Sequence, residues 1–192
     1  MTEGDSQGTQ ELIKRLLRPG REQELDPFVI ITFMPIEPYD HVADIGCGPG
    51  YFTIPLAKHL IHGKLYALDI SDEMLDALRR RLAEVHMGNV VSLKCSPLDF
   101  PVERESLDGA FLAFVVHANE DRVAFLKAVR DLLKPRGWCT VLLHYRKDTE
   151  YGPPIEKRIE PDEMNALARE AGFQVRWWRD LNGDHYMAML RK

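Results

Sequence analysis

Apolar and polar residues follow two patterns along the chain, one typical of strands and one typical of helices, and these patterns alternate. From His41 onward, short apolar runs typical of buried strands alternate with longer stretches in which apolar residues recur at helical spacing. These patterns predict strands at 41–45, 64–70, 89–95, 107–116, 138–144, 173–181 and 185–190, and helices at 49–60, 71–85, 120–133 and 161–171. Strands that alternate with helices predict an α/β protein with a doubly wound, mostly parallel sheet.

The end of the chain departs from a plain doubly wound pattern. The last two predicted strands are separated by Asn182-Gly183, a dipeptide that strongly favours a hairpin turn. A hairpin places the last strand antiparallel, beside its predecessor. The sequence therefore predicts seven strands, of which the last is antiparallel.

The residues before the first strand are predicted to be helical. Apolar residues at Leu12, Ile13 and Leu16 give an amphipathic pattern over 10–17, and Asp26-Pro27 resembles a helix cap with proline in the first turn. The helix that follows, 28–34, is almost wholly apolar and is expected to be buried. Residues 1–9 are small and polar and are expected to form a disordered tail. A single domain is predicted over 10–192.

Composition narrows the class of protein. The net charge of −5 disfavours a nucleic-acid partner, which usually calls for a basic face. The three cysteines are widely spaced and lack a CxxC pair, so we expect neither a disulfide framework nor a metal site. The first residues lack a signal-peptide pattern, and no apolar run has membrane-spanning length. We expect a cytoplasmic protein without membrane insertion.

The chemistry is concentrated where the first strand runs into a glycine-rich loop, residues 42–50. Glycines permit positive φ and close approach of a ligand to the backbone, and the helix that follows offers free N–H groups to an anion. In open α/β sheets, ligands lie at the carboxyl ends of the strands. Both the composition and the position of this loop therefore predict a nucleotide site.

The spacing of the glycines distinguishes between nucleotides. Dinucleotide-binding loops follow GxGxxG, whereas Gly46, Gly48 and Gly50 give GxGxG. Asp44, just before the loop, would repel a pyrophosphate. S-adenosylmethionine (SAM) carries no phosphate; Asp44 can favour its cationic end while the loop N–H groups receive its carboxylate. These observations favour SAM over NAD.

A second acid completes the predicted nucleotide site. Asp69 ends the second strand, 19 residues after Gly50, where a carboxylate can accept hydrogen bonds from both ribose hydroxyls. This feature by itself fits SAM and NAD equally. Ile70 and Met74 are placed to cover an adenine ring with apolar surface.

Residues 42–138 resemble class I, Rossmann-like SAM-dependent methyltransferases, most closely the branch of the ubiquinone and menaquinone methyltransferases. The match rests on Asp44–Gly50 and on Leu68–Leu75. Ser106-Leu107-Asp108 and Leu133–Gly137 support it. The resemblance implies a seven-stranded sheet with the last strand antiparallel, and a helical lid formed by residues 10–40. It implies that SAM is the cofactor, S-adenosylhomocysteine (SAH) the product and a small molecule the methyl acceptor.

The resemblance also implies site residues. Those that bind the cofactor are expected to be Asp44, Gly46, Cys47, Gly48, Gly50, Tyr51, Phe52, Asp69, Ile70, Met74, Ser96, Pro97, Leu98 and Phe114. Cys47 is read as a small spacer. The family often has an acid five positions before the proline matched by Pro101, where it contacts the adenine amino group. Ser96 stands there, so either Ser96 or Asp99 is expected to take that role.

His117 is the candidate catalytic residue, because it follows the fourth strand, whose end faces the acceptor in the resembling family. A base is needed only if the acceptor must lose a proton. His144, Tyr145, His185 and Tyr186 are expected to be structural, and Arg79-Arg80-Arg81 to be a solvated surface. Two alternatives stay open at this point: an NAD-dependent oxidoreductase, and a SAM-binding protein without catalysis. The acceptor, its reacting atom and the oligomeric state are not encoded in any recognisable pattern.

Overall fold

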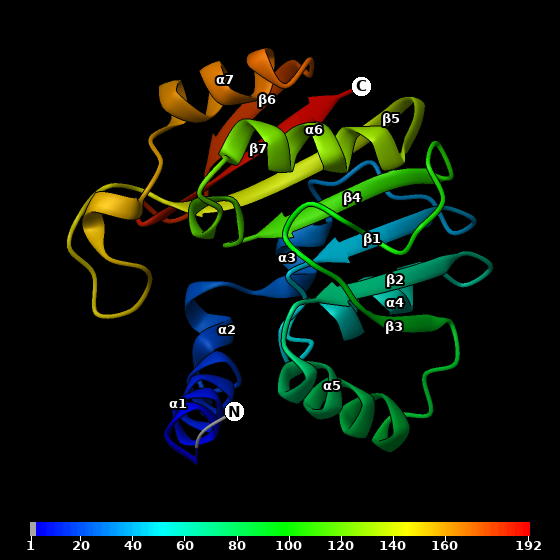
Figure 1. Ribbon diagram of the computed structural model, residues 1–192, viewed down its shortest axis with the longest axis vertical. Coiled ribbons are helices and arrows are strands. Elements are labelled where there is room, and N and C mark those ends of the chain that lie inside the picture. Colours follow the sequence, from blue (N-terminus) through cyan, green and yellow to red (C-terminus); the bar gives the residue numbers. More distant parts are fainter. Residues whose placement is uncertain (1–2) are drawn as a thin grey trace. The chain divides into compact units, whose positions relative to one another are not determined.

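The seven predicted strands form one mixed sheet in the computed structural model, which describes residues 3–192 (Figure 1). The strand order is β3-β2-β1-β4-β5-β7-β6. Neighbouring strands pair in parallel from β1 to β3 and between β4 and β5, whereas β7 is antiparallel to both β5 and β6. The strands are β1 His41–Ile45, β2 Lys64–Asp69, β3 Val90–Lys94, β4 Leu107–Ala113, β5 Leu133–His144, β6 Gln174–Asp180 and β7 His185–Arg191. This arrangement confirms the predicted fold class.

The chain divides into two compact units, the first ending at Ser96 and the second beginning at Pro97. The helices of the first unit are α1 Glu3–Leu16, α2 Arg21–Glu24, α3 Pro27–Ile31, α4 Thr53–His59 and α5 Asp72–Glu84. Those of the second are α6 Arg122–Leu132 and α7 Pro161–Glu170, with short 3-10 helices η1 Val116–Ala118 and η2 Ile155–Lys157. The prediction of a single domain over 10–192 remains a prediction.

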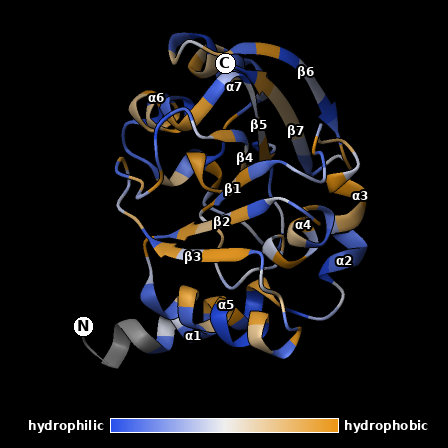
Figure 2. Ribbon diagram, turned by 90° about the vertical axis from the view of Figure 1, so that its right-hand side faces the viewer, coloured by the Kyte–Doolittle hydropathy of each residue, from blue (hydrophilic) through white to orange (hydrophobic). Residues whose placement is uncertain are grey.

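Helix α5 shows how the first unit is built from an amphipathic pattern. Ser71 caps it by accepting a hydrogen bond from the backbone N–H of Met74 at 3.3 Å, as predicted. Its apolar residues Leu75, Leu78 and Leu82 are buried and pack in one cluster with Ala67 of β2. Figure 2 shows the corresponding bands of hydrophobic and hydrophilic residues along this helix. The cluster fixes the start of α5 beside the end of β2.

The N-terminal helices differ from their predicted bounds. Helix α1 begins at Glu3 rather than Gln10, so it includes most of the segment that was expected to be disordered; residues 1–2 lie outside the described part of the chain. The apolar pattern begins only at Leu12, but extending an existing helix costs far less than starting one. Helix α2 has no counterpart among the predicted elements.

Helix α3 has the predicted cap but not the predicted burial. The carboxylate of Asp26 accepts hydrogen bonds from the N–H groups of Phe28 at 2.8 Å and Val29 at 3.4 Å. The expectation that the whole helix is buried is wrong. The side chains of Phe28 and Val29 are about half exposed, while Ile30 and Ile31 are buried. A helix this short at the edge of the unit turns only one side toward the core.

The second unit corrects two further boundaries. Strand β4 ends at Ala113, before the predicted end at Val116, because Phe114 adopts a left-handed conformation with φ 57°. Strand β5 begins at Leu133 and runs through Pro135–Gly137, where a turn was predicted. A register shift against β4 accommodates this stretch, since a bulge tolerates proline where a regular ladder does not.

The predicted C-terminal hairpin is present. Strands β6 and β7 pair antiparallel, and Gly183 in their connection has φ 73°. The side-chain oxygen of Asn182 accepts hydrogen bonds from the N–H groups of Asp184 and His185, at 3.1 and 3.0 Å. Asparagine and glycine thus shape the connection through a side-chain acceptor and a positive φ, as expected of these residue types.

Candidate functional site

The glycine loop joins β1 to α4 in the first unit and has the backbone geometry that its composition predicts. Gly46, Gly48 and Gly50 have φ values of 74°, 53° and 86°. The φ of Gly50 favours glycine, because residues with a side chain rarely adopt it, and a Cβ there would also lie 2.4 Å from a methyl carbon of Leu78. Because this turn extends to Phe52, α4 begins at Thr53 and not at Pro49 as predicted.

Asp44 lies at the end of β1 and is almost completely buried. Its carboxylate accepts a hydrogen bond from the Thr53 hydroxyl at 2.6 Å, which ties the end of the strand to the start of α4. Burial raises the pKa of Asp44 to about 7; the bond from Thr53 opposes this rise, and the charge of Asp69 adds to it. The predicted attraction of a cation by Asp44 therefore depends on pH, and it remains a prediction.

This burial predicts how stability changes with pH. Because the pKa of Asp44 is higher in the folded state than in the unfolded chain, its contribution is full below about pH 4 and is lost as the pH rises toward 7. Asp44→Asn should remove up to about 1.4 kcal/mol per pH unit of that decline in unfolding free energy. Urea unfolding of both ligand-free proteins across this range measures the difference. Parallel stability profiles would contradict it.

Asp69 connects the glycine loop to α5. One carboxylate oxygen accepts a hydrogen bond from the N–H of Gly48 at 2.8 Å, and the other accepts one from the N–H of Ser71 at 2.9 Å. The side chain is largely buried, and this burial raises its pKa, while the backbone donors lower it. Each oxygen has a further lone pair, so this carboxylate can still accept two hydroxyl groups. Its position fits the predicted ribose contact.

The glycine loop also contacts Arg81 of α5, whose role the sequence did not reveal. Arg81 donates a hydrogen bond to the carbonyl of Pro49 at 2.7 Å and is half-buried, whereas Arg79 and Arg80 are exposed. The prediction of a solvated arginine run is thus wrong for Arg81. Its place three residues after the buried Leu78 was the available signal, since such residues share a helix face. Cys47 is buried, and burial raises the pKa of its thiol.

An N-terminal segment packs against the same loop. The Tyr51 hydroxyl donates a hydrogen bond to the carbonyl of Leu25 at 2.8 Å, and the Arg21 guanidinium lies 4.1 Å above the Tyr51 ring. A side-chain carbon of Leu16 lies 3.7 Å from where a Cβ on Gly48 would be. Arg21 did not stand out in the sequence, because its partner Tyr51 lies far from it along the chain.

The remaining predicted cofactor residues of the first unit differ in exposure. Ile70 is 61% exposed at the end of β2, whereas Met74 is buried in α5. The backbone N–H of Cys95 donates to the carbonyl of Asp69 at 3.0 Å, which brings Cys95, and after it the exposed Ser96, next to the end of β2. In the second unit, Pro97, Leu98 and Asp99 are exposed. The contacts assigned to these residues remain predictions.

Three rings gather at the end of β4 in the second unit. The Phe114 ring centroid lies 4.6 Å from that of His144 and 5.6 Å from that of His185, and the two imidazoles lie 4.5 Å apart. Both histidines are buried, in keeping with the structural role predicted for them. The left-handed conformation of Phe114 is strained for a residue with a side chain, and such strain clusters at functional sites.

His117 lies in η1, just after this aromatic cluster in sequence. Its pKa is lowered to about 4, mainly by burial and in addition by the positive charges of Arg122, Lys157 and Arg158. The imidazole is therefore neutral at physiological pH, the state in which it can accept a proton.

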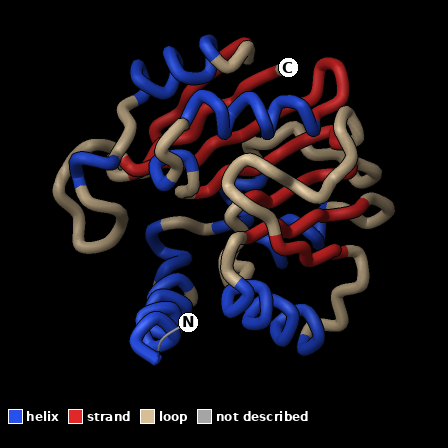
Figure 3. The backbone as a smooth tube through the Cα atoms, in the orientation of Figure 1, coloured by secondary structure: helices blue, strands red, loops and turns tan. Residues whose placement is uncertain are grey.

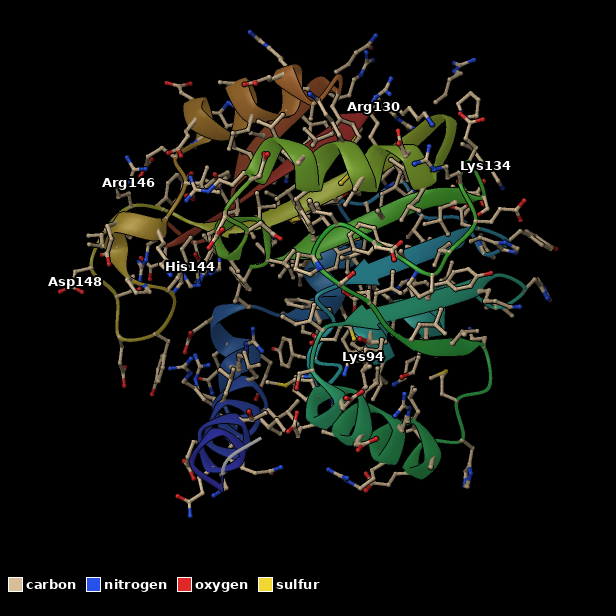
Figure 4. The ribbon with its side chains drawn as sticks, in the orientation of Figure 1. Lys94, Arg130, Lys134, His144, Arg146 and Asp148 are labelled. Carbon is tan, nitrogen blue, oxygen red and sulfur yellow. The ribbon has the colours of Figure 1, made fainter. Side chains whose placement is uncertain are left out.

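The connection from β5 to α7, residues 145–160, is held by one buried side chain. The Arg158 guanidinium donates hydrogen bonds to the carbonyls of Tyr145, Lys147, Tyr151 and Pro153, all on this connection. Figure 3 shows it as a long loop interrupted by η2. In Figure 4, His144 marks the end of β5, and Arg146 and Asp148 follow on the loop.

The described residues lack both a metal-binding cluster and a membrane-spanning helix. Across residues 3–192, no three His, Cys, Asp or Glu side chains are grouped so that they could hold a metal ion. None of the helices in that range is both long enough and apolar enough to cross a membrane.

Comparison with known proteins adds the family. The model of a methyltransferase domain matches residues 42–137. A demethylmenaquinone methyltransferase of Symbiobacterium thermophilum is 29% identical over 71% of this chain and 69% of its own. A solved SAM-dependent methyltransferase from Aquifex aeolicus is 25% identical, with a TM-score of 0.88, over 94% of this chain and 97% of its own. The [4+2]-cyclase SpnF shares the fold at 13% identity, with a TM-score of 0.74, over 86% of this chain and 80% of its own.

The chain spans between 26% and 69% of the length of the first curated relatives that it matches. The matched family region includes the glycine loop, Asp69 and His117.

Proposed function

The chain belongs to the class I SAM-dependent methyltransferases, and we propose that it transfers the methyl group of SAM to a small-molecule acceptor. The observation that carries the proposal is the Asp69 carboxylate, which is held by the glycine loop on one side and by the start of α5 on the other. That arrangement leaves lone pairs of a fixed acid beside a positive-φ glycine loop.

The residues of the first unit fit the chemical groups of SAM. Asp69 would hold the ribose hydroxyls, and the exposed Ile70 would lie against the adenine ring. The glycine loop allows close approach of the methionyl part. When bound, SAM supplies an electrophilic methyl group on a sulfonium, and the protein's task is to align the acceptor and exclude water.

His117 is proposed as the proton acceptor when the acceptor molecule must be deprotonated. Support comes from its neutral state at physiological pH and from its position shortly after Phe114, the strained residue that follows β4. The rings of Phe114, His144 and His185 would support this strand end.

Ligand binding tests the cofactor directly. Calorimetry should show binding of SAM and SAH and no binding of NAD or NADP. Transfer of a labelled methyl group should then be screened against phenols, thiols, amines and quinone precursors, and one class should accept it. Binding of NAD without SAM would overturn the proposal. Binding of SAH without transfer to any class would instead favour a SAM-binding protein without this activity.

A further inference from the structure

Arg21 is a buried cation whose hydrogen-bonding capacity is largely unused. Arg21 is only 5% exposed, and its guanidinium carries five N–H donors. Within the described residues, the carbonyl of Leu16 is its single hydrogen-bond acceptor, at 2.5 Å. Of the two acids on α2, Glu22 is exposed and Glu24 pairs with Arg18 at 2.6 Å. A charge withdrawn from water in this way is costly unless an anion accompanies it.

The guanidinium is stacked rather than solvated. It lies 4.1 Å above the ring of Tyr51 and 5.7 Å from that of Phe52. Burial lowers the pKa of Arg21 to about 10, which leaves it positively charged at physiological pH. The contact with the Tyr51 ring restricts the guanidinium, whose planar fork of donors suits a carboxylate better than it suits a single carbonyl oxygen.

Its neighbours place this cation beside the glycine loop. Tyr51 directly follows Gly50, and its hydroxyl is anchored on the carbonyl of Leu25 at 2.8 Å. Leu16, whose carbonyl receives the Arg21 bond, packs toward Gly48, the residue that donates to Asp69. The Arg21 side chain thus contacts Leu16 in the N-terminal segment and Tyr51, which directly follows the glycine loop.

We propose that Arg21 binds the carboxylate of the methionyl part of SAM, and so makes the α1–α2 segment part of the cofactor site. The inference rests on the proposed cofactor. It adds a charged partner to the loop N–H groups, and it gives the buried guanidinium a hydrogen-bonded anion. The charge of Glu24 acts on Arg21 from nearby, but that carboxylate is paired with Arg18. The α1–α2 segment then contacts the amino-acid part of the ligand and not its nucleoside.

A purely structural role for Arg21 leads to a different expectation. If the side chain only clamps the N-terminal segment onto Tyr51, its removal should weaken every ligand of the loop to the same extent. A carboxylate partner predicts a selective loss. The two roles are separated by a pair of ligands that share the nucleoside and differ in the carboxylate.

SAH and 5′-methylthioadenosine form such a pair, because the second lacks the amino-acid part. Calorimetry on Arg21→Ala should show SAH binding weakened by roughly 10- to 100-fold, as expected for loss of one or two charge-assisted hydrogen bonds. Binding of 5′-methylthioadenosine should change by less than about twofold. Arg21→Lys, which keeps the charge but not the fork, should lose SAH affinity selectively and to a smaller extent.

Arg18→Ala is the matched control, because Arg18 lies just before α2 and its partner Glu24 is partly exposed. It should bind both ligands as the native protein does, and thermal unfolding checks that each variant folds. Equal weakening of both ligands in the Arg21 variants, or unchanged SAH binding, would overturn the assignment while leaving the cofactor in place. A native protein that binds neither ligand would overturn the proposed function itself.

Discussion

Asp69→Ala should weaken SAH binding by roughly 100-fold or more without unfolding the protein. Two charge-assisted hydrogen bonds to ribose hydroxyls are lost, each worth on the order of 1.5 to 3 kcal/mol, and tenfold in affinity corresponds to about 1.4 kcal/mol. The N–H groups of Gly48 and Ser71 also lose their acceptor, so the loop and the start of α5 are released from each other. Calorimetric titration with SAH measures the loss, and circular dichroism checks the fold.

Two further variants separate charge from position. Asp69→Asn keeps one acceptor oxygen and removes the charge, so its affinity should fall less than that of the alanine variant. Asp72→Ala removes an exposed acid at the start of the same helix, paired with Lys94, and should bind SAH normally. An unchanged dissociation constant for Asp69→Ala would show that the ribose lies elsewhere.

His117→Ala should lower the rate of methyl transfer by about 100-fold and leave SAH affinity unchanged. A general base contributes about 100- to 10,000-fold, and a weakly basic one belongs at the lower end of that range. Because the pKa of His117 is about 4, the imidazole is unprotonated and active above that value. The native rate should therefore fall only as the pH drops through about 4, and the variant should lack this fall. Single-turnover measurements with an acceptor from the screen give the rate and its pH dependence, and calorimetry gives the SAH affinity.

His59→Ala is a suitable comparison, since His59 is exposed at the end of α4. It should retain the native rate. Full activity of His117→Ala would make that histidine a structural residue. Loss of SAH binding together with loss of folding would show that it supports the end of β4 instead of the reaction.

The parts of the protein that the sequence predicted well depend on neighbouring residues. The glycine loop needs positive φ at three positions close together, and Asp69 is recognisable as the acid that ends a buried strand. The hairpin likewise depends on Asn182-Gly183. Such features are encoded within a few residues, so a single sequence reveals them.

The parts that it did not predict depend on pairings between distant segments. The stack of Arg21 on Tyr51 and the meeting of Phe114 with His144 and His185 follow from tertiary packing and strand register. The start of β5 was missed for the same reason. Pro135–Gly137 reads locally as a turn, and pairing with β4 extends the strand through it.

The grip of Arg158 on its loop has a consequence for how this protein can evolve. Arg158 binds main-chain carbonyls, which every residue possesses, so these contacts do not depend on the side chains at the positions that they join. Arg146, Lys147 and Thr149 add side-chain contacts of their own. Gly152 is an exception, because a Cβ there would lie 2.8 Å from the His144 ring. At loop positions whose side chains make no such contact, mutations can alter the chemistry of the loop surface while its backbone is retained. Relatives that keep this arginine and glycine can therefore diverge in what they recognise without first losing a folded loop.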